Sequence, residues 1–233
     1  MVVIATSLIY GVYAGAIVLP ERYDPWAALD PKAEPGPLTG WRLARAKADP
    51  VACMAALGRT DAVFERVTDR VTAPGCGFSN AVRLSAVGTR LSSPATLSCP
   101  VALSLVMWQR HTLQPAARRM HGEGVARIDH LGSYACRNVN RGEGAPSAAR
   151  SRHATADAFD VAAFVFESGR RVTVLRDWES EDAPEAPADR DAGFLREAHR
   201  GACRYFDGVL GPEYNAVHAD HFHLETGGWR MCR

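Results

Sequence analysis

The sequence predicts an α+β fold with a small, mainly antiparallel sheet and helices packed on one side of it. Three observations predict this class. Two short apolar segments, Asn80–Leu84 and Leu91–Leu97, flank a glycine turn and are typical of strands. A third segment, Val161–Phe166, is apolar without interruption, which favours a strand buried on both faces. Apolar residues after Pro50 and Cys99 recur with helical spacing instead.

The N-terminal part of the chain differs from the rest. Residues 1–19 carry no charged side chain and approach the ~20 apolar residues that a helix needs to cross a bilayer. They predict an export signal or a membrane anchor, which places the protein in the periplasm or another extracytoplasmic space, tethered to the inner membrane. Five prolines in residues 20–38 exclude a regular helix and favour a stiff linker. The folded domain is therefore expected over residues 39–233.

Composition narrows the class of protein. The 233 residues are 47% hydrophobic and 23% charged, which is enough to bury a core. The formal net charge is +1, and the arginines are scattered among acids rather than gathered in a basic stripe. We therefore expect no nucleic-acid partner. The sequence predicts no particular oligomeric state.

The cysteines predict disulfide bonds. All six lie in the expected folded domain, and an even number in an exported protein favours up to three disulfides. Structural zinc on thiolates is a poor alternative, because no two cysteines have CxxC spacing. We expect Cys76 to pair with Cys99, and Cys203 to pair with Cys232.

The first half of the domain alternates helices and strands. Asp49 before Pro50 predicts a capped helix over Pro50–Leu57. The two strands around the glycine turn follow. A longer helix is expected from Cys99 to about Leu113, with Pro115 breaking or kinking it. A strand is expected over Val125–Leu131.

The second half is expected to bring acids and histidines to the sheet. Residues 138–150 predict a mobile loop. Asp160 stands at the start of a hairpin formed by Val161–Phe166 and Arg171–Leu175. The acidic segment 177–191 predicts a surface loop. Asp191 can cap a helix whose apolar face extends to Val209 and which Gly211 stops after Leu210, and a last strand is expected over Ala219–Glu225.

Four of the eight histidines lie in two short segments that also contain acids. On an extended strand His221 and His223 would share a face, since side chains alternate with period two. His153 and Asp160 could complete a zinc site with His223, because a catalytic zinc keeps three protein ligands and an open fourth position. The alternative is ordinary: Asp157, Asp160 and Asp220 could be turn or strand-entry residues. The other histidines, His111, His121, His130 and His199, are expected to be surface or hydrogen-bonded core residues.

These segments carry a resemblance. Residues 151–160 resemble the Ser-x-His-x-x-Gly-x-Ala-x-Asp signature of the zinc D-Ala-D-Ala carboxypeptidases, which cut peptides of bacterial peptidoglycan. His218-Ala219-Asp220-His221-Phe222-His223 resembles the His-x-x-His-x-His ending of penicillin-insensitive murein endopeptidases. From Cys53 to Arg233 the chain is similar to the bacterial extensin-like C-terminal domain family, through residues 132–137, 211–215 and 232–233.

The resemblance to zinc peptidases implies roles for individual residues. His153, Asp160 and His223 would bind Zn²⁺ at the edge of the sheet, and His221 would be the base that acts on the attacking water. His218 would be an auxiliary group. Arg137 would hold a substrate carboxylate or the developing oxyanion.

Two departures from the peptidase pattern are visible. Ala156 stands where the signature has glycine, which is harmless only if the position needs no positive φ. His221 takes the place of the carboxylate base of the carboxypeptidases, and Glu225 is an alternative acid whose expected role is a surface or supporting contact.

Two functions of different class follow. The first is a zinc-dependent peptidase, either carboxypeptidase or endopeptidase, that acts on peptidoglycan stem peptides or cross-links. The second is a non-catalytic wall-binding or scaffolding module that retains the peptidase fold. A purely structural zinc domain is a weaker third possibility, because structural sites are closed by four protein ligands and usually use cysteine.

Overall fold

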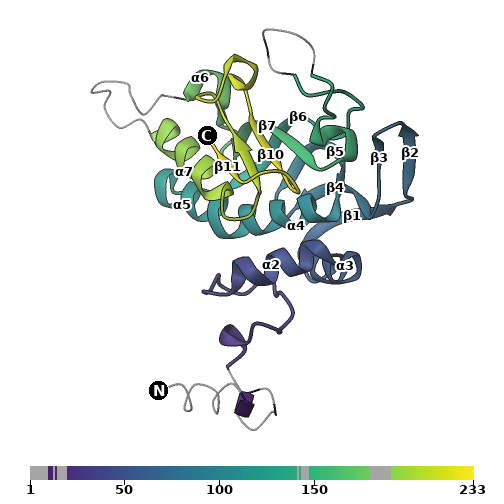
Figure 1. Cartoon of the computed structure of the whole chain (residues 1–233). Coiled ribbons are helices and arrows are strands. Elements are labelled where there is room, and N and C mark those ends of the chain that lie inside the picture. The colour runs from purple at the N-terminus through teal and green to yellow at the C-terminus, as the bar shows by residue number, and fades with distance from the viewer. Residues whose placement is uncertain (1–9, 13, 15–19, 141, 143–146, 179–189) are drawn as a thin grey trace.

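The computed structural model describes residues 10–12, 14, 20–140, 142, 147–178 and 190–233. It confirms the α+β class, with a mostly antiparallel sheet, several helices and three disulfides. Figure 1 shows the two helices α2 and α3 beneath the rest of the domain. The hairpin β2–β3 projects at the right-hand side of the domain in this view.

The main sheet contains nine strands among the described residues, so it is larger than expected. The strand order is β1-β4-β5-β6-β7-β10-β9-β11, and β8 pairs with β7. The pairs β5–β6 and β9–β11 are parallel and the others antiparallel. The strands are β1 (Ala62–Val67), β4 (Ala81–Val87), β5 (Arg90–Ser98), β6 (Val125–Gly132), β7 (Ala158–Phe166), β8 (Arg171–Thr173), β9 (Gly208–Leu210), β10 (Phe222–Glu225) and β11 (Met231–Cys232); the separate hairpin is β2 (Arg70–Ala73) and β3 (Cys76–Phe78).

Most helices lie in the N-terminal and middle parts of the chain. They are η1 (Glu21–Tyr23), α2 (Thr39–Ala48), α3 (Pro50–Gly58), α4 (Cys99–Trp108), η2 (Gln109–Leu113), α5 (Gln114–His121), η3 (Arg152–Thr155), α6 (Val174–Asp177), α7 (Arg190–Ala202) and η4 (Ala216–His218). The predicted cap of α3 is confirmed, because the Asp49 carboxylate accepts hydrogen bonds from the backbone N–H groups of Val51 and Ala52. Helix α4 packs against β4 and β5, and all of its residues except Pro100 are buried.

The helix that begins at Cys99 does not break at Pro115. A π-helical turn, η2, follows α4, and α5 continues with Pro115 in its first turn. Proline has no N–H to donate to the preceding turn, and a local change of helical pitch is one way to accommodate that loss. The chain therefore stays helical from Cys99 to His121.

Three predicted elements of the second half are corrected. Helix α7 ends at Ala202, and Gly208–Leu210 is strand β9, although the apolar spacing had suggested helix up to Leu210. Apolar residues three or four apart occur in helices and also where a helix is followed by a strand. Here the pairing with β10 and β11 makes Gly208–Leu210 a strand. Asp191 is the second residue of α7 and not its cap. Val174 and Leu175 belong to the short helix α6 instead of extending β8.

The disulfide framework is partly as predicted. Cys203 pairs with Cys232 as expected. The expected Cys76–Cys99 bond is wrong: Cys53 pairs with Cys99, and Cys76 pairs with Cys136. The first of these links helices α3 and α4 in the core, and the second links strand β3 to the segment after β6.

The proline-rich segment 20–38 is attached to the domain. It contains the short helix η1, and Leu29 is buried in the hydrophobic core. The Arg59 guanidinium donates a hydrogen bond to the Leu29 carbonyl. None of the helices that the structure describes is long and apolar enough to cross a membrane. Most of the predicted anchor, residues 1–9, 13 and 15–19, lies outside the described residues, as do residues 141 and 143–146 of the predicted mobile loop and 179–189 of the acidic segment.

Candidate metal centre

His153, Asp160 and His223 lie together in the structure. The antiparallel register of β7 and β10 places His223 directly opposite Asp160, so the two side chains share one face of the sheet. Nδ1 of His223 lies 2.9 Å from Oδ1 of Asp160. Nε2 of His153 lies 3.1 Å from Oδ2 of Asp160 and 3.2 Å from Nδ1 of His223. The three side chains are buried. His223 is 63 residues from Asp160 and 70 from His153 along the chain, so the fold brings it to the other two.

These residues do not lie on an edge strand, contrary to expectation. Strand β7 lies between β6 and β10, and β10 lies between β7 and β9. The cluster therefore stands on two inner strands of the sheet. Neighbouring strands on both sides fix the positions of Asp160 and His223 more firmly than an edge would.

His153 reaches the cluster from η3, the short helix before β7. The Ser151 side chain caps this helix by accepting a hydrogen bond from the His153 N–H. Ala156 ends it in the left-handed conformation, with φ of +58°, and the chain then enters β7. The position thus has the positive φ that glycine adopts most easily, and alanine occupies it at a conformational cost.

Each histidine of the cluster has a hydrogen-bond partner on its other ring nitrogen. Nδ1 of His153 lies 2.5 Å from the Ser133 carbonyl oxygen, to which it donates as an N–H. Nε2 of His223 lies 2.9 Å from Oε2 of Glu225. Such partners fix the tautomer and orientation of metal-binding histidines. Ser133 was not recognisable from the sequence, because a backbone carbonyl leaves no signal in residue type.

Hydrogen bonds within the cluster shift the pKa values of Asp160 and His223. Burial opposes ionisation of Asp160, but hydrogen bonds from His153 and His223 outweigh it and hold the carboxyl pKa well below its usual range. Burial also opposes protonation of His223, yet hydrogen bonds to Asp160 and Glu225 raise its pKa to about 9. A metal ion would have to displace that proton.

His221 lies beside the cluster but not in the strand. Strand β10 begins at Phe222, and residues 219–221 form a turn that follows the short helix η4, so the alternation argument does not apply to His221. Its Nδ1 lies 2.7 Å from Oδ1 of Asp220, and its Nε2 lies 3.7 Å from Oδ1 of Asp160. Asp220, considered above as a turn residue, therefore orients His221 toward the cluster.

His218 ends η4 and packs against the same group. Its ring centroid lies 5.2 Å from that of His221 and 5.8 Å from that of His223. Nδ1 of His218 lies 2.6 Å from Oδ1 of Asn215, which accepts its hydrogen. Burial, with the charges of His221 and His223, lowers the pKa of His218 to about 4 and keeps the ring neutral.

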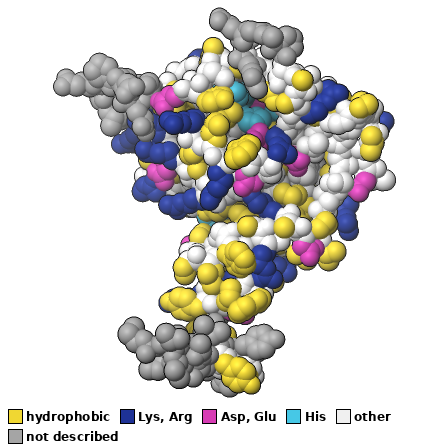
Figure 2. All heavy atoms as spheres, viewed as in Figure 1, with side chains coloured by type: hydrophobic (Ala, Val, Ile, Leu, Met, Phe, Trp, Pro, Cys, Tyr) yellow, Lys and Arg dark blue, Asp and Glu magenta, His cyan; other side chains and the backbone are white. Residues whose placement is uncertain are grey.

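A pocket of about 660 Å³ opens onto the cluster. Asp160, His218, His221 and His223 line it, and so does Arg137. The structure therefore brings Arg137 to the pocket that contains the histidines, while His153 lies behind them and is almost fully buried. Figure 2 shows histidine atoms at the surface between basic and hydrophobic side chains.

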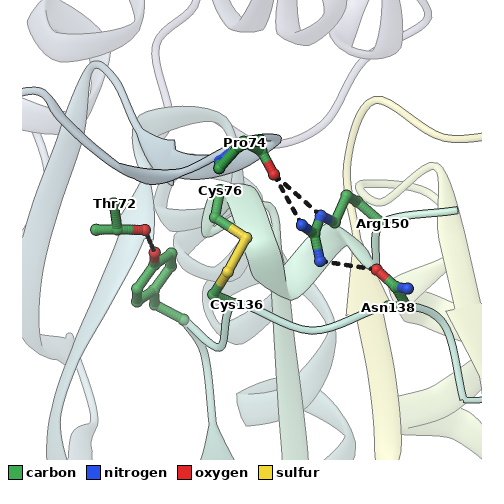
Figure 3. The surroundings of a disulfide bond; sticks show 7 residues. Thr72, Pro74, Cys76, Cys136, Asn138 and Arg150 are labelled. Atoms are coloured by element: carbon green, nitrogen blue, oxygen red, sulfur yellow. Dashed lines mark hydrogen bonds between the residues drawn. A yellow bond between two sulfur atoms is a disulfide. The ribbon is translucent and has the colours of Figure 1, made fainter. Parts of the chain in front are cut away.

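The segment that carries Ser133 and Arg137 has no regular secondary structure but is held firmly. The Cys76–Cys136 disulfide ties it to the hairpin β2–β3, and the Tyr134 hydroxyl hydrogen-bonds Thr72. Figure 3 shows this disulfide and, beside it, the Arg150 guanidinium, which donates to the Pro74 carbonyl and to the Asn138 side chain.

The donor set fits a zinc ion. Zinc prefers imidazole nitrogens and carboxylate oxygens at ~2.0–2.2 Å in a tetrahedral arrangement, which sets its ligand atoms about 3.3 Å apart. The separations of 2.9 to 3.2 Å among His153, Asp160 and His223 are close to that value. Among the described residues these three are the group whose ligand atoms could share one ion. The pocket leaves room for a further ligand.

Fold and site together define a disulfide-bonded α+β domain with a His₂Asp cluster at the floor of a pocket. A family model described as the C-terminus of extensin-like proteins matches residues 51–233. The chain therefore belongs to the extensin-like C-terminal family. No curated protein and no solved structure matches the chain significantly.

Proposed function

We propose that this protein is a zinc-dependent peptidase that acts on peptidoglycan stem peptides or cross-links outside the cytoplasmic membrane. The observation that carries the proposal is the mutual approach of His153, Asp160 and His223, each side chain within 3.2 Å of the other two, at the floor of a pocket. The likeness of residues 151–160 and 218–223 to the zinc peptidases of peptidoglycan supports the choice of substrate.

Each of the two histidine ligands is held by a hydrogen-bond partner of its own. The Ser133 carbonyl holds the hydrogen of His153 on Nδ1 and leaves Nε2 for the metal. Glu225 does the equivalent for His223, holding the hydrogen on Nε2. Asp160 contributes the negative charge. Zinc in this position would polarise the scissile carbonyl and lower the pKa of a coordinated water toward ~7.

His221 is the residue placed to move a proton. Asp220 holds the hydrogen on Nδ1, so the lone pair on Nε2, which lies 3.7 Å from Oδ1 of Asp160, can accept a proton from the attacking water. The same ring can then return that proton to the leaving amine. His218 stays neutral beside it and adds a second imidazole without adding positive charge.

Arg137 supplies positive charge at the pocket wall. Its side chain is exposed and lines the pocket, and its charge is among the smaller causes of the lowered pKa of His218. A guanidinium can hold a substrate carboxylate by two parallel hydrogen bonds or stabilise a developing oxyanion. In this proposal residues 1–19 tether the domain to the membrane and residues 20–38 link the two.

The test is metal content followed by digestion of purified peptidoglycan. The wild type should bind one zinc ion per chain and release stem-peptide fragments, whereas His221→Ala should retain the zinc and lose most of the activity. His111→Ala is the matched control, since His111 hydrogen-bonds the Pro31 carbonyl in another part of the domain. Stoichiometric zinc with no cleavage product under any condition would favour a wall-binding module instead.

A further inference from the structure

Trp229 lies on the rim of the same pocket and is 90% exposed to solvent. Leaving a tryptophan side chain exposed keeps a large apolar surface in contact with water, which is unfavourable for the folded protein. Exposed tryptophans at a pocket are typical contact residues for a ligand. None of the roles assigned above uses this side chain.

The turn that carries Trp229 is fixed. Gly227 has φ of +74° and donates its N–H to the Asp207 carboxylate at 2.8 Å. The Arg152 guanidinium donates to the Gly227 carbonyl. After the turn, the Cys203–Cys232 disulfide and the parallel pairing of β11 with β9 hold the chain again. The backbone that carries the Trp229 side chain is therefore fixed in position.

Further apolar surface lies around the same pocket. Tyr214 is 42% exposed, and its ring packs edge-on against His218 at 5.4 Å between centroids, which fixes its orientation. Met231 and Val139 are also partly open to solvent and line the pocket. Trp229 thus belongs to an open apolar rim that lies beside the histidine cluster.

Planar polar side chains line the pocket as well. They are the guanidinium groups of Arg137 and Arg152 and the amides of Asn140 and Asn215. A sugar ring has matching chemistry: its C–H face stacks on an aromatic ring, and its hydroxyl and acetamido groups hydrogen-bond to planar side chains at its edge. An apolar peptide side chain would instead need an enclosed pocket, because its binding free energy comes from removing its whole apolar surface from water. An open indole beside amides and guanidinium groups suits a sugar better.

We propose that Trp229 is a binding platform for a sugar ring of the glycan to which the substrate peptide is attached. This inference rests on the proposed function, because it takes the peptide to be linked to a glycan strand. The protein then selects glycan-linked stem peptides over free ones. Binding of the sugar at Trp229 holds the attached peptide next to His221 and the metal ligands.

The experiment measures binding by titration calorimetry with the purified full chain. Three probes are compared: a peptide-free tetrasaccharide of alternating N-acetylglucosamine and N-acetylmuramic acid, a disaccharide-linked stem peptide, and the free stem peptide of the same sequence. Trp229→Ala should weaken binding of both glycan probes at least about tenfold, and binding of the free peptide by less than about twofold. Trp229→Phe should retain part of the affinity. Trp41→Ala removes another exposed tryptophan, on α2, and should leave all three unchanged.

Several outcomes would overturn the platform. Equal loss for the free peptide and the linked peptide would show that Trp229 contacts the peptide. If Trp229→Ala left the affinity for every probe unchanged, the platform would be contradicted. The same holds if the variant instead lost binding to anionic phospholipid vesicles, because Trp229 would then contact a membrane.

Cleavage assays separate this inference from the proposed function. If the wild type cleaves no probe, but Trp229→Ala binds the glycan probes more weakly than the wild type does, only the proposed peptidase activity is contradicted. Equal cleavage of free and linked peptides by wild type and Trp229→Ala contradicts only the platform.

Discussion

The Oε2 atom of Glu225 lies 2.9 Å from Nε2 of His223, on the side of the ring opposite the nitrogen that faces Asp160. The two residues are next but one on β10, and alternation along the strand places them on the same face. Glu225 therefore contacts His223, one of the three candidate metal ligands. His223 is held between two carboxylates, which fixes its orientation.

Loss of this support should weaken metal binding. We expect Glu225→Ala to lower zinc affinity about 10- to 100-fold, because the ring of His223 is then free to turn and is less basic. Competition with a chromophoric chelator measures the affinity, and Glu225→Gln should recover part of it. Glu65→Ala, an exposed change on β1, is the control. Equal affinities for wild type and Glu225→Ala would refute the supporting role.

Asp220 should matter for turnover rather than for the metal. Its carboxylate lies 2.7 Å from Nδ1 of His221 and keeps Nε2 free to accept a proton. We expect Asp220→Ala to reduce kcat about 10- to 100-fold while KM and zinc content stay close to wild type. Steady-state kinetics on a stem-peptide substrate and metal analysis test this. A rise in KM at constant kcat would mean that Asp220 contributes to substrate binding instead.

Two of the disulfides offer a matched comparison. Replacing both members of Cys76–Cys136 or of Cys53–Cys99 by serine removes a cross-link over 60 or 46 residues, and each should cost about 2–5 kcal/mol of unfolding free energy. Only the first change frees the segment that carries Ser133 and Arg137. We therefore expect lower zinc affinity in the Cys76/Cys136 variant alone, measured under conditions where both variants are folded. Equal zinc affinities in the two variants would show that the segment is held by other contacts.

The parts of the structure that the sequence predicts well are those with a local cause. Asp49 before Pro50 is a sufficient signal for the start of α3, because a cap acts within one turn. The glycine turn at Gly88 separates the two predicted strands β4 and β5. The proximity of His153, Asp160 and His223 could be anticipated because residues 151–160 and 218–223 resemble the signatures of zinc peptidases.

Features that depend on distant pairing could not be predicted. The partner of Cys76 is decided by the position of the hairpin β2–β3 over the segment after β6, which no local pattern encodes. The assignment of Gly208–Leu210 to a strand depends on its neighbours β10 and β11. The alternation that aligns His221 with His223 in the predicted strand fails because residues 219–221, the first part of that strand, form a turn instead.

Ala156 provides a test of backbone strain near the cluster. In the left-handed region an alanine costs about 1–2 kcal/mol, and glycine relieves this while losing a buried methyl group worth ~0.8 kcal/mol. We expect Ala156→Gly to change the unfolding free energy by less than about 1 kcal/mol in either direction, since it also gains chain entropy when unfolded. Ala156→Val should destabilise by more than about 2 kcal/mol, because a β-branched residue fits neither the positive φ nor the buried space.

The control for Ala156 is Ala154, which is equally buried in η3 but has no positive φ. Ala154→Gly gains no relief of strain and should destabilise by about 1 kcal/mol or more. Urea denaturation of the three variants gives the comparison. If Ala156→Gly cost as much as Ala154→Gly, the left-handed conformation would carry no strain.

His199 should make stability fall in weakly acidic solution. It is buried on α7 against Phe222 and Trp178, and burial lowers its pKa to about 4, against weaker opposing effects of the Arg233 backbone and Glu213. The unfolded chain takes up a proton below about pH 6.5, whereas the folded protein does so only below about pH 4. Protons therefore favour unfolding in this window. Stability is fully present above pH 6.5 and is lost as the pH falls toward 4.

The contribution of His199 can be isolated by comparing pH dependences. Between pH 7 and pH 4.5 the wild type should lose about 2 kcal/mol more unfolding free energy than His199→Leu, which has no proton to take up there. Urea denaturation at a series of pH values measures both curves, and the difference in slope removes any constant effect of the substitution. Parallel curves would mean that His199 keeps its ordinary pKa in the folded protein, or that another group governs the acid sensitivity of this domain.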